Sequence, residues 1–383
     1  MSHKKTNTKT AFLSEGKNYW STFKPIIEAL IDKQVFFSYY TFDKKDPGLS
    51  VKNKFISSKY LGRGVWGYYK ASTIEAELLV STTPNIGNAR FPIKRSPNVK
   101  NLIHVFHSIT DISIYKKGSL DFYDTVILAG DFQTESIREI EKIRNLPQKE
   151  LVCLGLPYID ELVKEKVENV SNKSHKTILV GSSWGAKGCL NSYGIEFIEK
   201  IASAGYDVII RPHPQSYISE PKRIKGFEKQ LKNYTNIDWD NEVSPSRAMS
   251  KADLLISDTS SIRFDFAFLY KKPVITLAIE PEEMAEYERA DLNYSWSDEA
   301  EKNIGFVLNK NSVGNIVEYI ARAEKEYDAS KIESFRDKTI CNFGKAGEAI
   351  SNYLLNKIGE NQNKINEREL QRFEYYTFRC RKT

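Results

Sequence analysis

The segment that most constrains the fold is ISDTSSIRFDFAFLYKKPVIT, from Ile256 to Thr276. Its apolar start ends in a run of Asp, Thr and Ser, and an amphipathic stretch follows at once and stops before Lys-Pro. A strand, a hydroxyl-rich turn, a helix and a second strand satisfy this pattern. The turn would bring its hydroxyls and the free N–H groups of the helix to the carboxyl edge of a parallel sheet. Because helix N-termini bind phosphate, the segment predicts a site for a phosphate-bearing substrate.

Strand-type runs alternate with amphipathic stretches along the whole chain, which is typical of an α/β fold with parallel sheets. In the first half we expect helices at Tyr19–Asp32 and Asp131–Arg144. The expected strands of this half are Thr10–Leu13, Val35–Tyr40, Ala76–Ser81, Asn101–Phe106, Thr125–Ala129 and Leu151–Leu154. This order predicts one doubly wound domain.

A polar stretch without periodicity, Glu165 to Lys176, predicts a linker to a second domain of the same kind. Beyond it we expect helices at Tyr193–Ala204 and Ile262–Leu269, and strands at Thr177–Gly181, Asp207–Arg211, Leu254–Ser257 and Pro273–Leu277. The expected division is a first domain over residues 1–168, a second over 176–346 and a helical tail over 347–383. Ligands of such proteins bind in the cleft between the two sheet edges.

Composition narrows the class of protein. The 383 residues are 40% hydrophobic, but wholly apolar runs are only a few residues long, so no transmembrane helix is expected. The start MSHKKTNTKT lacks the apolar core of a secretory signal, and we expect a cytoplasmic protein. The net charge of +6 suits an acidic substrate or an anionic membrane face, and equally a solvated lysine-rich surface. No nucleic-acid-binding motif is present, so nucleic acid is not an expected partner.

The cysteines are scattered along the chain and show no paired spacing. We therefore predict reduced thiols rather than a zinc site or a disulfide framework. The four residues are Cys153, Cys189, Cys341 and Cys380.

Candidate phosphate ligands follow a strand of the second half. In VIIRPHPQS, Arg211 and His213 come directly after apolar residues, with prolines holding the turn. A guanidinium and an imidazole at a strand end suit a pyrophosphate. The alternative is a histidine that merely ends the strand. The pair Asp238 and Asp240 in IDWD is interpreted as a surface turn rather than a metal site.

The segment ILVGSSWGAKG is a second candidate for contacting the ligand. Ser182 and Ser183 follow a glycine that allows a ligand close to backbone N–H groups. Trp184 could stack on a base or fill the core. The segment matches neither the dinucleotide fingerprint nor the Walker loop, so dinucleotide and ATP sites are not supported.

The segment NLIHVFHSITD contains two histidines, for which we predict different roles. His104 lies inside the predicted strand and is interpreted as packing. His107 comes where the strand ends, at the edge that would line the cleft. An imidazole there could act as general base on an acceptor hydroxyl, and position alone leaves a structural role equally open.

These segments together resemble the CDP-glycerol glycerophosphotransferase family, the teichoic acid primases and polymerases and their capsule-forming relatives. His107 matches a Trp-His-Gly-type element, and YDTVILAGDFQTESI and LGLPYIDEL resemble the next two elements of the family. RPHP and SDTSSIRFDFAFLYKKPVI are similar to its Arg-x-His-Pro and Ser-Asp-x-Ser-Ser elements. The resemblance spans roughly Leu102 to Leu277.

The resemblance implies a GT-B fold and an enzyme that transfers glycerol phosphate or ribitol phosphate from a CDP-alditol. The acceptor would be a hydroxyl of a cell-surface polysaccharide or a polyprenyl-linked molecule at the inner face of the membrane, and CMP would be released. His107 would be the base, and His213, Ser260 and Ser261 would hold the donor pyrophosphate. Asp258 and Asp265 would shape the turn and helix. The full set of predicted site residues is His107, His213, Arg211, Ser182, Ser183, Trp184, Asp258, Thr259, Ser260 and Ser261.

The sequence departs from the family at two places. Ser108 stands where the family usually has Gly, and SSWG stands where many members have Pro-Thr-Trp-Arg. The missing Arg leaves the donor open between glycerol and ribitol forms, and no motif decides whether Mg²⁺ takes part.

Two other functions fit the same scaffold, since a fold does not fix chemistry. A sugar transferase or nucleotide-sugar epimerase could use Glu280 and Glu282 on sugar hydroxyls. A non-catalytic nucleotide-binding protein would keep the cleft without turnover. The basic and aromatic end of the chain, ERELQRFEYYTFRCRKT, could lie on an anionic membrane or pack back on the first domain.

Overall fold

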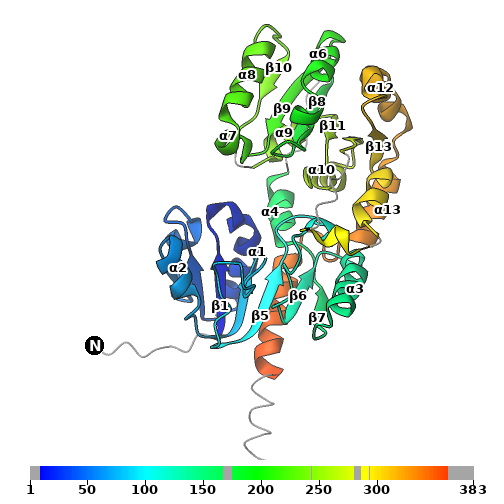
Figure 1. Ribbon diagram of the computed structural model, residues 1–383. Coiled ribbons are helices and arrows are strands. Elements are labelled where there is room, and N and C mark those ends of the chain that lie inside the picture. Colours follow the sequence, from blue (N-terminus) through cyan, green and yellow to red (C-terminus); the bar gives the residue numbers. More distant parts are fainter. Residues whose placement is uncertain (1–8, 167–174, 243, 280–285, 293, 361–383) are drawn as a thin grey trace, which may run out of the picture.

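The computed structural model of the chain describes residues 9–166, 175–242, 244–279, 286–292 and 294–360. These residues form two parallel β-sheets, one above the other in Figure 1. The first sheet has seven strands in the order β3-β2-β1-β4-β5-β6-β7. Its strands are β1 (Thr10–Ser14), β2 (Phe37–Thr41), β3 (Ile56–Tyr60), β4 (Ala76–Ser81), β5 (Val99–Val105), β6 (Thr125–Leu128) and β7 (Glu150–Cys153).

The second sheet has six strands in the order β10-β9-β8-β11-β12-β13. They are β8 (Thr177–Ser182), β9 (Asp207–Pro212), β10 (Ile237–Trp239), β11 (Leu254–Ser257), β12 (Val274–Leu277) and β13 (Gly305–Leu308). In each sheet the chain order reverses beside the first strand, between β1 and β4 and between β8 and β11. Such reversal points leave a crevice at the carboxyl ends of the strands, where ligands bind.

Helices cover both faces of the two sheets. Those of the first half are α1 (Trp20–Asp32), α2 (Gly64–Ala71), α3 (Thr134–Arg144) and α4 (Pro157–Glu165). Those of the second half are α5 (Cys189–Ser192), α6 (Glu196–Ser203), α7 (Ser216–Ser219), α8 (Pro221–Leu231), α9 (Ser246–Lys251), α10 (Ile262–Tyr270), α11 (Trp296–Ala300), α12 (Ile316–Glu326) and α13 (Ala329–Thr339). A last helix occupies residues 346–360.

The predicted α/β architecture with parallel sheets is confirmed, and every expected strand overlaps an observed one. The helix expected at Tyr193 begins instead at Glu196, because Gly194 adopts a left-handed conformation with φ of 71° that ends the preceding turn. The strands missed are β3, β10 and β13, which lie at sheet edges. Edge strands bury less, so their apolar signal is weak; β3 reads ISSKY with no fully buried residue.

The end of the second half returns to the first sheet. Ile350 and Leu354 of the helix 346–360 are fully buried and belong to the same core as Phe12 and Phe23. The predicted tail thus begins as a helix packed on the first sheet, and its basic part, residues 361–383, lies outside the described residues. The central part of the predicted linker, residues 167–174, lies outside them as well, and the domain limits stay predictions.

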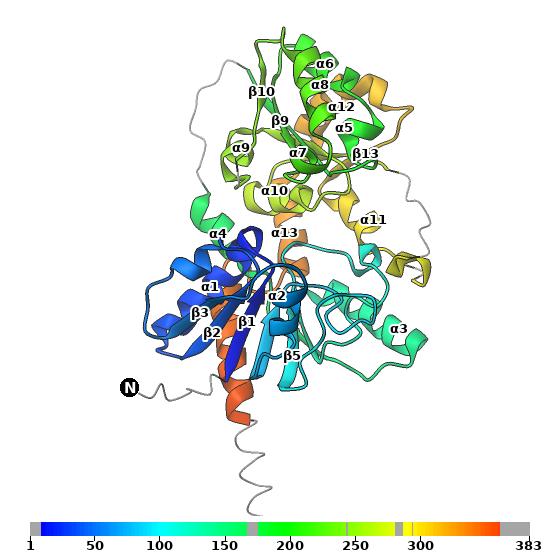
Figure 2. The same ribbon diagram turned by 60° about the vertical axis from the view of Figure 1, so that its left-hand side comes forward.

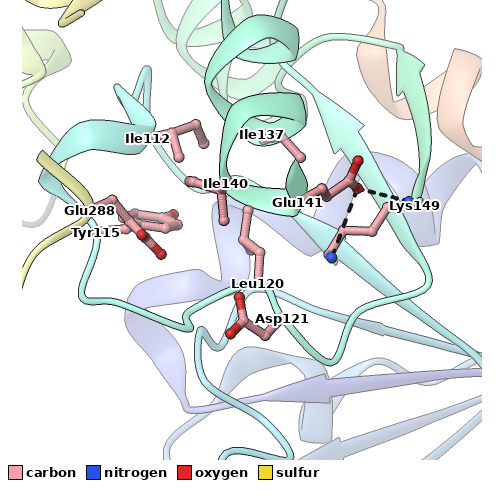
Figure 3. Close-up of a pocket in the computed structure, with 9 residues that line it drawn as sticks. All are labelled: Ile112, Tyr115, Leu120, Asp121, Ile137, Ile140, Glu141, Lys149 and Glu288. Atoms are coloured by element: carbon pink, nitrogen blue, oxygen red, sulfur yellow. Dashed lines mark hydrogen bonds and ion pairs between the residues drawn. The ribbon is translucent and has the colours of Figure 1, made fainter. Parts of the chain in front are cut away.

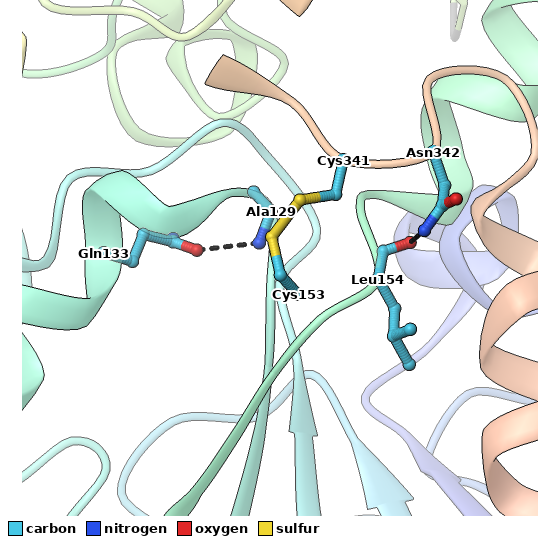
Figure 4. The surroundings of a disulfide bond; sticks show 6 residues. All are labelled: Ala129, Gln133, Cys153, Leu154, Cys341 and Asn342. Atoms are coloured by element: carbon cyan, nitrogen blue, oxygen red, sulfur yellow. Dashed lines mark hydrogen bonds between the residues drawn. A yellow bond between two sulfur atoms is a disulfide. The ribbon is translucent and has the colours of Figure 1, made fainter. Parts of the chain in front are cut away.

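A disulfide joins Cys153, at the end of β7, to Cys341, after α13 (Figure 4). The prediction of reduced thiols is wrong for this pair. The two cysteines are 188 residues apart, and they meet because the returning chain runs along the first sheet, where Cys341 N donates to Ala129 O at 2.9 Å. Nothing in the spacing of the cysteines could reveal this approach. Cys189 is a buried free thiol, and Cys380 lies outside the described residues.

Removing the disulfide is expected to lower stability. Its closed loop is long, so Cys341→Ser should reduce the free energy of unfolding by about 2–5 kcal/mol. Urea unfolding of the parent with and without reductant, beside the variant, measures this. Reductant should shift the parent to the variant's midpoint and leave the variant unchanged; a parent midpoint that ignores reductant contradicts the assignment.

Candidate active site between the two sheets

Asp258 ties two loops of the second sheet together at the ends of β8 and β11. It is fully buried, and its carboxylate accepts hydrogen bonds from Ser183 N at 2.9 Å, Ser183 Oγ at 2.5 Å, Cys189 N at 2.6 Å and Ser260 N at 3.0 Å. All these donors belong to the protein, so Asp258 fixes the two loops. Its predicted place among the substrate contacts does not fit these bonds.

The predicted turn and helix at Ser261 are present. Ser261 is the N-cap of α10, and its side chain makes no capping hydrogen bond. Ser260 and Ser261 are half-buried, and Thr259 is exposed. A helix start carries positive potential and N–H groups that the helix does not use. The turn therefore offers hydroxyls and N–H groups to an anion.

Arg211 and His213 lie at the end of β9 with different surroundings. Arg211 is buried and forms an ion pair with Asp240, and it donates to Glu242 O at 2.9 Å. Its predicted direct contact with pyrophosphate does not fit these partners. The interpretation of IDWD as a surface turn is also wrong, because its first three residues form β10 and Asp240 answers the buried charge of Arg211.

His213 is exposed, and its Nδ1 accepts a hydrogen bond from Gln215 N at 3.1 Å. Neutral imidazole carries one proton, so this contact places the proton on Nε2. Desolvation lowers the pKa of His213, while the charge of Asp258 raises it and that of Arg211 lowers it. Strands β9 and β11 both pair with β8 at Gly181, so the RPHP loop and the hydroxyl-rich turn lie at the same edge of the sheet.

Ser182 and Ser183 use their hydroxyls inside the protein. Ser182 Oγ donates to Ser183 O at 2.9 Å and accepts from Leu190 N at 3.3 Å, and Ser183 Oγ donates to Asp258. Their predicted role as ligands through the side chain does not fit these bonds. Trp184 is 53% exposed, so it does not fill the core and its ring is free to meet a ligand.

On the first sheet, His107 lies two residues beyond β5, at the carboxyl edge. The ring of Tyr19 meets it edge-on with centroids 5.1 Å apart. Among the described residues, its buried Nδ1 has no hydrogen-bond partner. Burial lowers the pKa of His107 to about 4. The imidazole is therefore neutral at neutral pH and can accept a proton.

A half-buried carboxyl, Glu15, lies beside Tyr19, whose ring contacts this histidine, and it was missed in the sequence. Glu15 follows β1, and burial raises its pKa while the hydroxyls of Thr83 and Tyr19 lower it. Burial and the charge of Glu15 raise the pKa of Tyr19 to about 12. The signal that could have found Glu15 is its place after the apolar run AFLS, at the same edge as His107. Perturbed groups at a sheet edge mark candidate functional sites.

His104 is fully buried among aromatic rings, as its place in the strand predicted. The rings of Phe106 and Tyr123 lie 4.8 and 4.9 Å from it, and neither of its nitrogens has a hydrogen-bond partner among the described residues. Burial, and then the neighbouring His107, lower the pKa of His104 to about 3.

These two histidines predict an acid-sensitive fold. Their pKa values lie below the ordinary value of 6.5, so below that pH the unfolded chain binds more protons. Stability is then complete above about pH 6.5 and falls toward pH 4, by up to about 1.4 kcal/mol per pH unit for each histidine. Urea unfolding at pH 7.5 and 5 of the parent and of His104→Leu tests this. The variant should lose less stability than the parent on acidification; equal losses contradict the assignment.

Contacts between the two halves hold the site walls in place. The hydroxyl of Tyr158 in α4 donates to buried Asp265 in α10, and burial raises the pKa of Asp265 to about 7. The ring of Phe132 stacks on Trp296 with centroids 4.0 Å apart. Asp265 therefore anchors helix α10 to α4 of the first half.

A small cavity lies where the chain after residue 286 meets the first half (Figure 3). Its volume is about 10 Å³, and it is lined by Ile112, Tyr115, Leu120, Asp121, Ile137, Ile140, Glu141, Lys149 and Glu288. A space of this size holds about one water molecule. None of the predicted site residues lines it. Arg144 beside it binds Asp121 and Glu288, so the cavity belongs to the contact between the halves.

Both metal-binding clusters and membrane-spanning helices are absent from the described part of the chain. Within it, no group of three or more His, Cys, Asp or Glu side chains could hold a metal ion. No helix within the same residues has the length and apolar character needed to cross a bilayer.

Solved structures with the same arrangement share little sequence with this chain. UDP-GlcNAc 2-epimerase of Methanocaldococcus jannaschii, in complex with UDP-GlcNAc and UDP, matches with a TM-score of 0.58 and 15% identity, over 90% of this chain and 99% of that one. A putative UDP-N-acetylglucosamine 2-epimerase of Listeria monocytogenes gives 0.60 and 11%, over 93% and 97%. WaaG, a glycosyltransferase involved in lipopolysaccharide biosynthesis, gives 0.51 and 14%, over 90% and 99%. The expected GT-B fold is confirmed.

A comparison with curated protein sequences finds no match. The sequence model of CDP-Glycerol:Poly(glycerophosphate) glycerophosphotransferase matches residues 2–356, nearly the whole chain. This confirms the resemblance seen in the sequence motifs: the chain belongs to the CDP-glycerol:poly(glycerophosphate) glycerophosphotransferase family and is a transferase.

Proposed function

We propose that this enzyme transfers glycerol phosphate or ribitol phosphate from a CDP-alditol to a hydroxyl of a cell-surface polysaccharide or lipid-linked acceptor. CMP is the other product. The observation that carries the proposal is the pairing of two edges: a helix start with the uncapped N-cap Ser261 on the second sheet, and a neutral, half-buried histidine, His107, on the first. Phosphoryl transfer needs charge stabilisation on one side and a proton acceptor on the other.

The donor diphosphate binds at the start of α10. Ser260 and Ser261 supply hydroxyls, and the helix start supplies N–H groups and positive potential. His213 donates its Nε2–H to a phosphate oxygen without needing a charge, because Gln215 N–H occupies Nδ1. The exposed ring of Trp184 stacks on the cytosine.

In this proposal Arg211 does not contact the donor and instead holds a loop of the site in place. Its ion pair with Asp240 fixes the end of β9 and so aims the RPHP turn. Asp258 likewise fixes the hydroxyl-rich turn against the loop after β8. Both are positioning residues rather than donor contacts.

The reaction is a displacement at the phosphorus that carries the alditol. The acceptor oxygen forms a new bond to this phosphorus, and the bond between the phosphorus and the bridging oxygen of CMP breaks. His107 takes the proton of the acceptor hydroxyl. Because its pKa is low, His107 is a weak base, and the proton moves to it as the new bond forms. The helix start and His213 stabilise charge on the transferring group and on CMP.

A panel of donors tests the proposal. CDP-glycerol, CDP-ribitol and UDP-sugars are each incubated with the enzyme and a lipid-linked or oligomeric alditol phosphate acceptor, and free nucleotide is measured. Release of CMP from a CDP-alditol, dependent on acceptor, is expected. Release from UDP-sugars alone favours the sugar transferase, and binding without turnover for every acceptor favours the non-catalytic protein; either result contradicts the proposal.

We further propose that the enzyme works at the inner face of the cell membrane, where a lipid-linked acceptor lies. The net charge of +6 suits attraction to an anionic bilayer.

A further inference from the structure

The short helix α2 exposes three large apolar side chains to solvent. Val65 is 81% exposed, Trp66 is 75% exposed and Tyr69 is 62% exposed. We call these three residues the apolar face. Single exposed apolar residues are ordinary on protein surfaces, but three within two helical turns form a patch.

The opposite side of α2 holds the helix on the first sheet, so the apolar face cannot turn inward. Gly67 and Ala71 are buried, and a Cβ at Gly67 would lie 2.5 Å from Gly62 O. The ring of Tyr68 packs on Phe42 with centroids 5.6 Å apart. Figures 1 and 2 place α2 on the outside of the first half, with no other helix or strand of the described residues covering it.

Basic residues outnumber acidic ones in the stretch of chain around the apolar face. Between residues 44 and 74 the chain has seven Lys and Arg residues and one acidic residue, Asp46, which is buried. Asp43 and Glu75 flank this stretch, and Asp43 lies 3.8 Å from the guanidinium of Arg63, which is itself exposed. Asp46 is also occupied, because it accepts hydrogen bonds from Tyr39 and Thr41. The exposed basic side chains nearest in sequence or sheet register to α2, here called the basic rim, are Lys44, Lys45, Lys59, Arg63 and Lys70.

We propose that the apolar face and the basic rim of α2 dock this enzyme on an anionic lipid bilayer. Tryptophan and tyrosine favour the boundary between lipid headgroups and acyl chains, and cations beside them attract anionic headgroups. A soluble polyanion would explain the basic rim but not the apolar face. A second copy of the chain would bring two basic rims together, which is unfavourable.

Docking through α2 places the bilayer at the outer end of the carboxyl edge of the first sheet, four strand spacings from β5, which leads to His107. Helix α2 follows β3, so it begins at the carboxyl edge of the first sheet. His107 follows β5 at that same edge, because all strands of the sheet are parallel. A lipid-linked acceptor in the bilayer would then reach the cleft from the side of the first sheet. The docking itself does not depend on which group the enzyme transfers.

Vesicle sedimentation of the full chain tests the surface. Phosphatidylcholine vesicles with and without phosphatidylglycerol are compared for the parent, for Val65→Ser with Trp66→Ser, and for Arg63→Glu with Lys70→Glu. The parent should bind the phosphatidylglycerol vesicles preferentially, and each double variant should bind them about ten-fold less. Thermal melts of the variants should match the parent, because the substituted side chains are exposed.

A matched control reverses two positive charges on a different surface helix, α8. Lys229 and Lys232 are exposed in and directly after α8, a helix with no large exposed apolar residue among those described. Lys229→Glu with Lys232→Glu should leave the bound fraction within two-fold of the parent, a change of about 0.4 kcal/mol or less.

Three outcomes overturn the proposal. Parental vesicle binding by both α2 variants would assign the membrane contact to another part of the chain, such as residues 361–383. Loss of binding in the charge variant alone would indicate a polyanion site. Loss of self-association in the Val65 and Trp66 variant, with unchanged vesicle binding, would indicate a contact between copies.

Discussion

His107→Ala is expected to lower turnover by about 10²–10⁴-fold, the range for removal of a general base, while donor affinity stays near the parental value. The physical reason is location: His107 lies on the first sheet, away from the helix start and His213 that hold the diphosphate in our proposal. Its imidazole, with a pKa near 4, is neutral at neutral pH, so a nitrogen lone pair is free to take the proton as the new bond forms. Steady-state kinetics and donor titration of the purified variant measure the two effects separately.

His104→Ala is the internal control for this prediction. His104 is three residues away, fully buried and surrounded by aromatic rings. Its removal leaves a cavity, so it should cost stability more than turnover. The base assignment is contradicted by a His107→Ala enzyme that folds, binds donor and transfers the alditol phosphate at close to the parental rate.

Loss of the donor contacts should give the second large effect. His213→Ala and Ser261→Ala each remove a group that faces the diphosphate in our proposal, at a cost of about 1.5–3 kcal/mol in kcat/KM, which is about ten- to 150-fold. Neither side chain supports the core: His213 is exposed, and the Ser261 hydroxyl does not cap its own helix.

Ser182→Ala is a matched serine control. Its hydroxyl is buried and bonded to Ser183 O and Leu190 N, so its loss should lower stability and leave donor kinetics nearly unchanged. Normal donor kinetics in both His213→Ala and Ser261→Ala would remove the phosphate site from the start of α10.

Local chemistry explains what could be predicted from the sequence. The turn at Ser261 was predictable because an apolar strand, a hydroxyl run and an amphipathic segment follow one another within one short stretch. The position of His107 was predictable because it ends an apolar run. Both are properties of neighbouring residues, and a parallel sheet brings such strand ends to one edge.

The features that could not be predicted depend on residues that are far apart in the sequence and meet only in the folded chain. The pairing of Arg211 with Asp240 joins two strands that are neighbours only in the folded sheet, and it removes Arg211 from the set of free cations. The disulfide requires the chain after α13 to return to the first sheet. The sequence suggested that Ser182 and Ser183 contact a ligand. Only the folded structure shows that their hydroxyls bond to protein groups instead. Glu15 was missed because one carboxyl after a strand is common, and its burial beside Tyr19 is a tertiary property.

The fate of the two donor phosphates tests the central claim most directly. CDP-glycerol labelled at the phosphorus next to glycerol is incubated with the enzyme and acceptor, and the products are separated. Transfer of glycerol phosphate predicts that the label moves to the acceptor together with glycerol and that unlabelled CMP is released. Label retained in released CDP, with glycerol alone transferred, would mean that the bond between glycerol and phosphate breaks, and it would contradict the account.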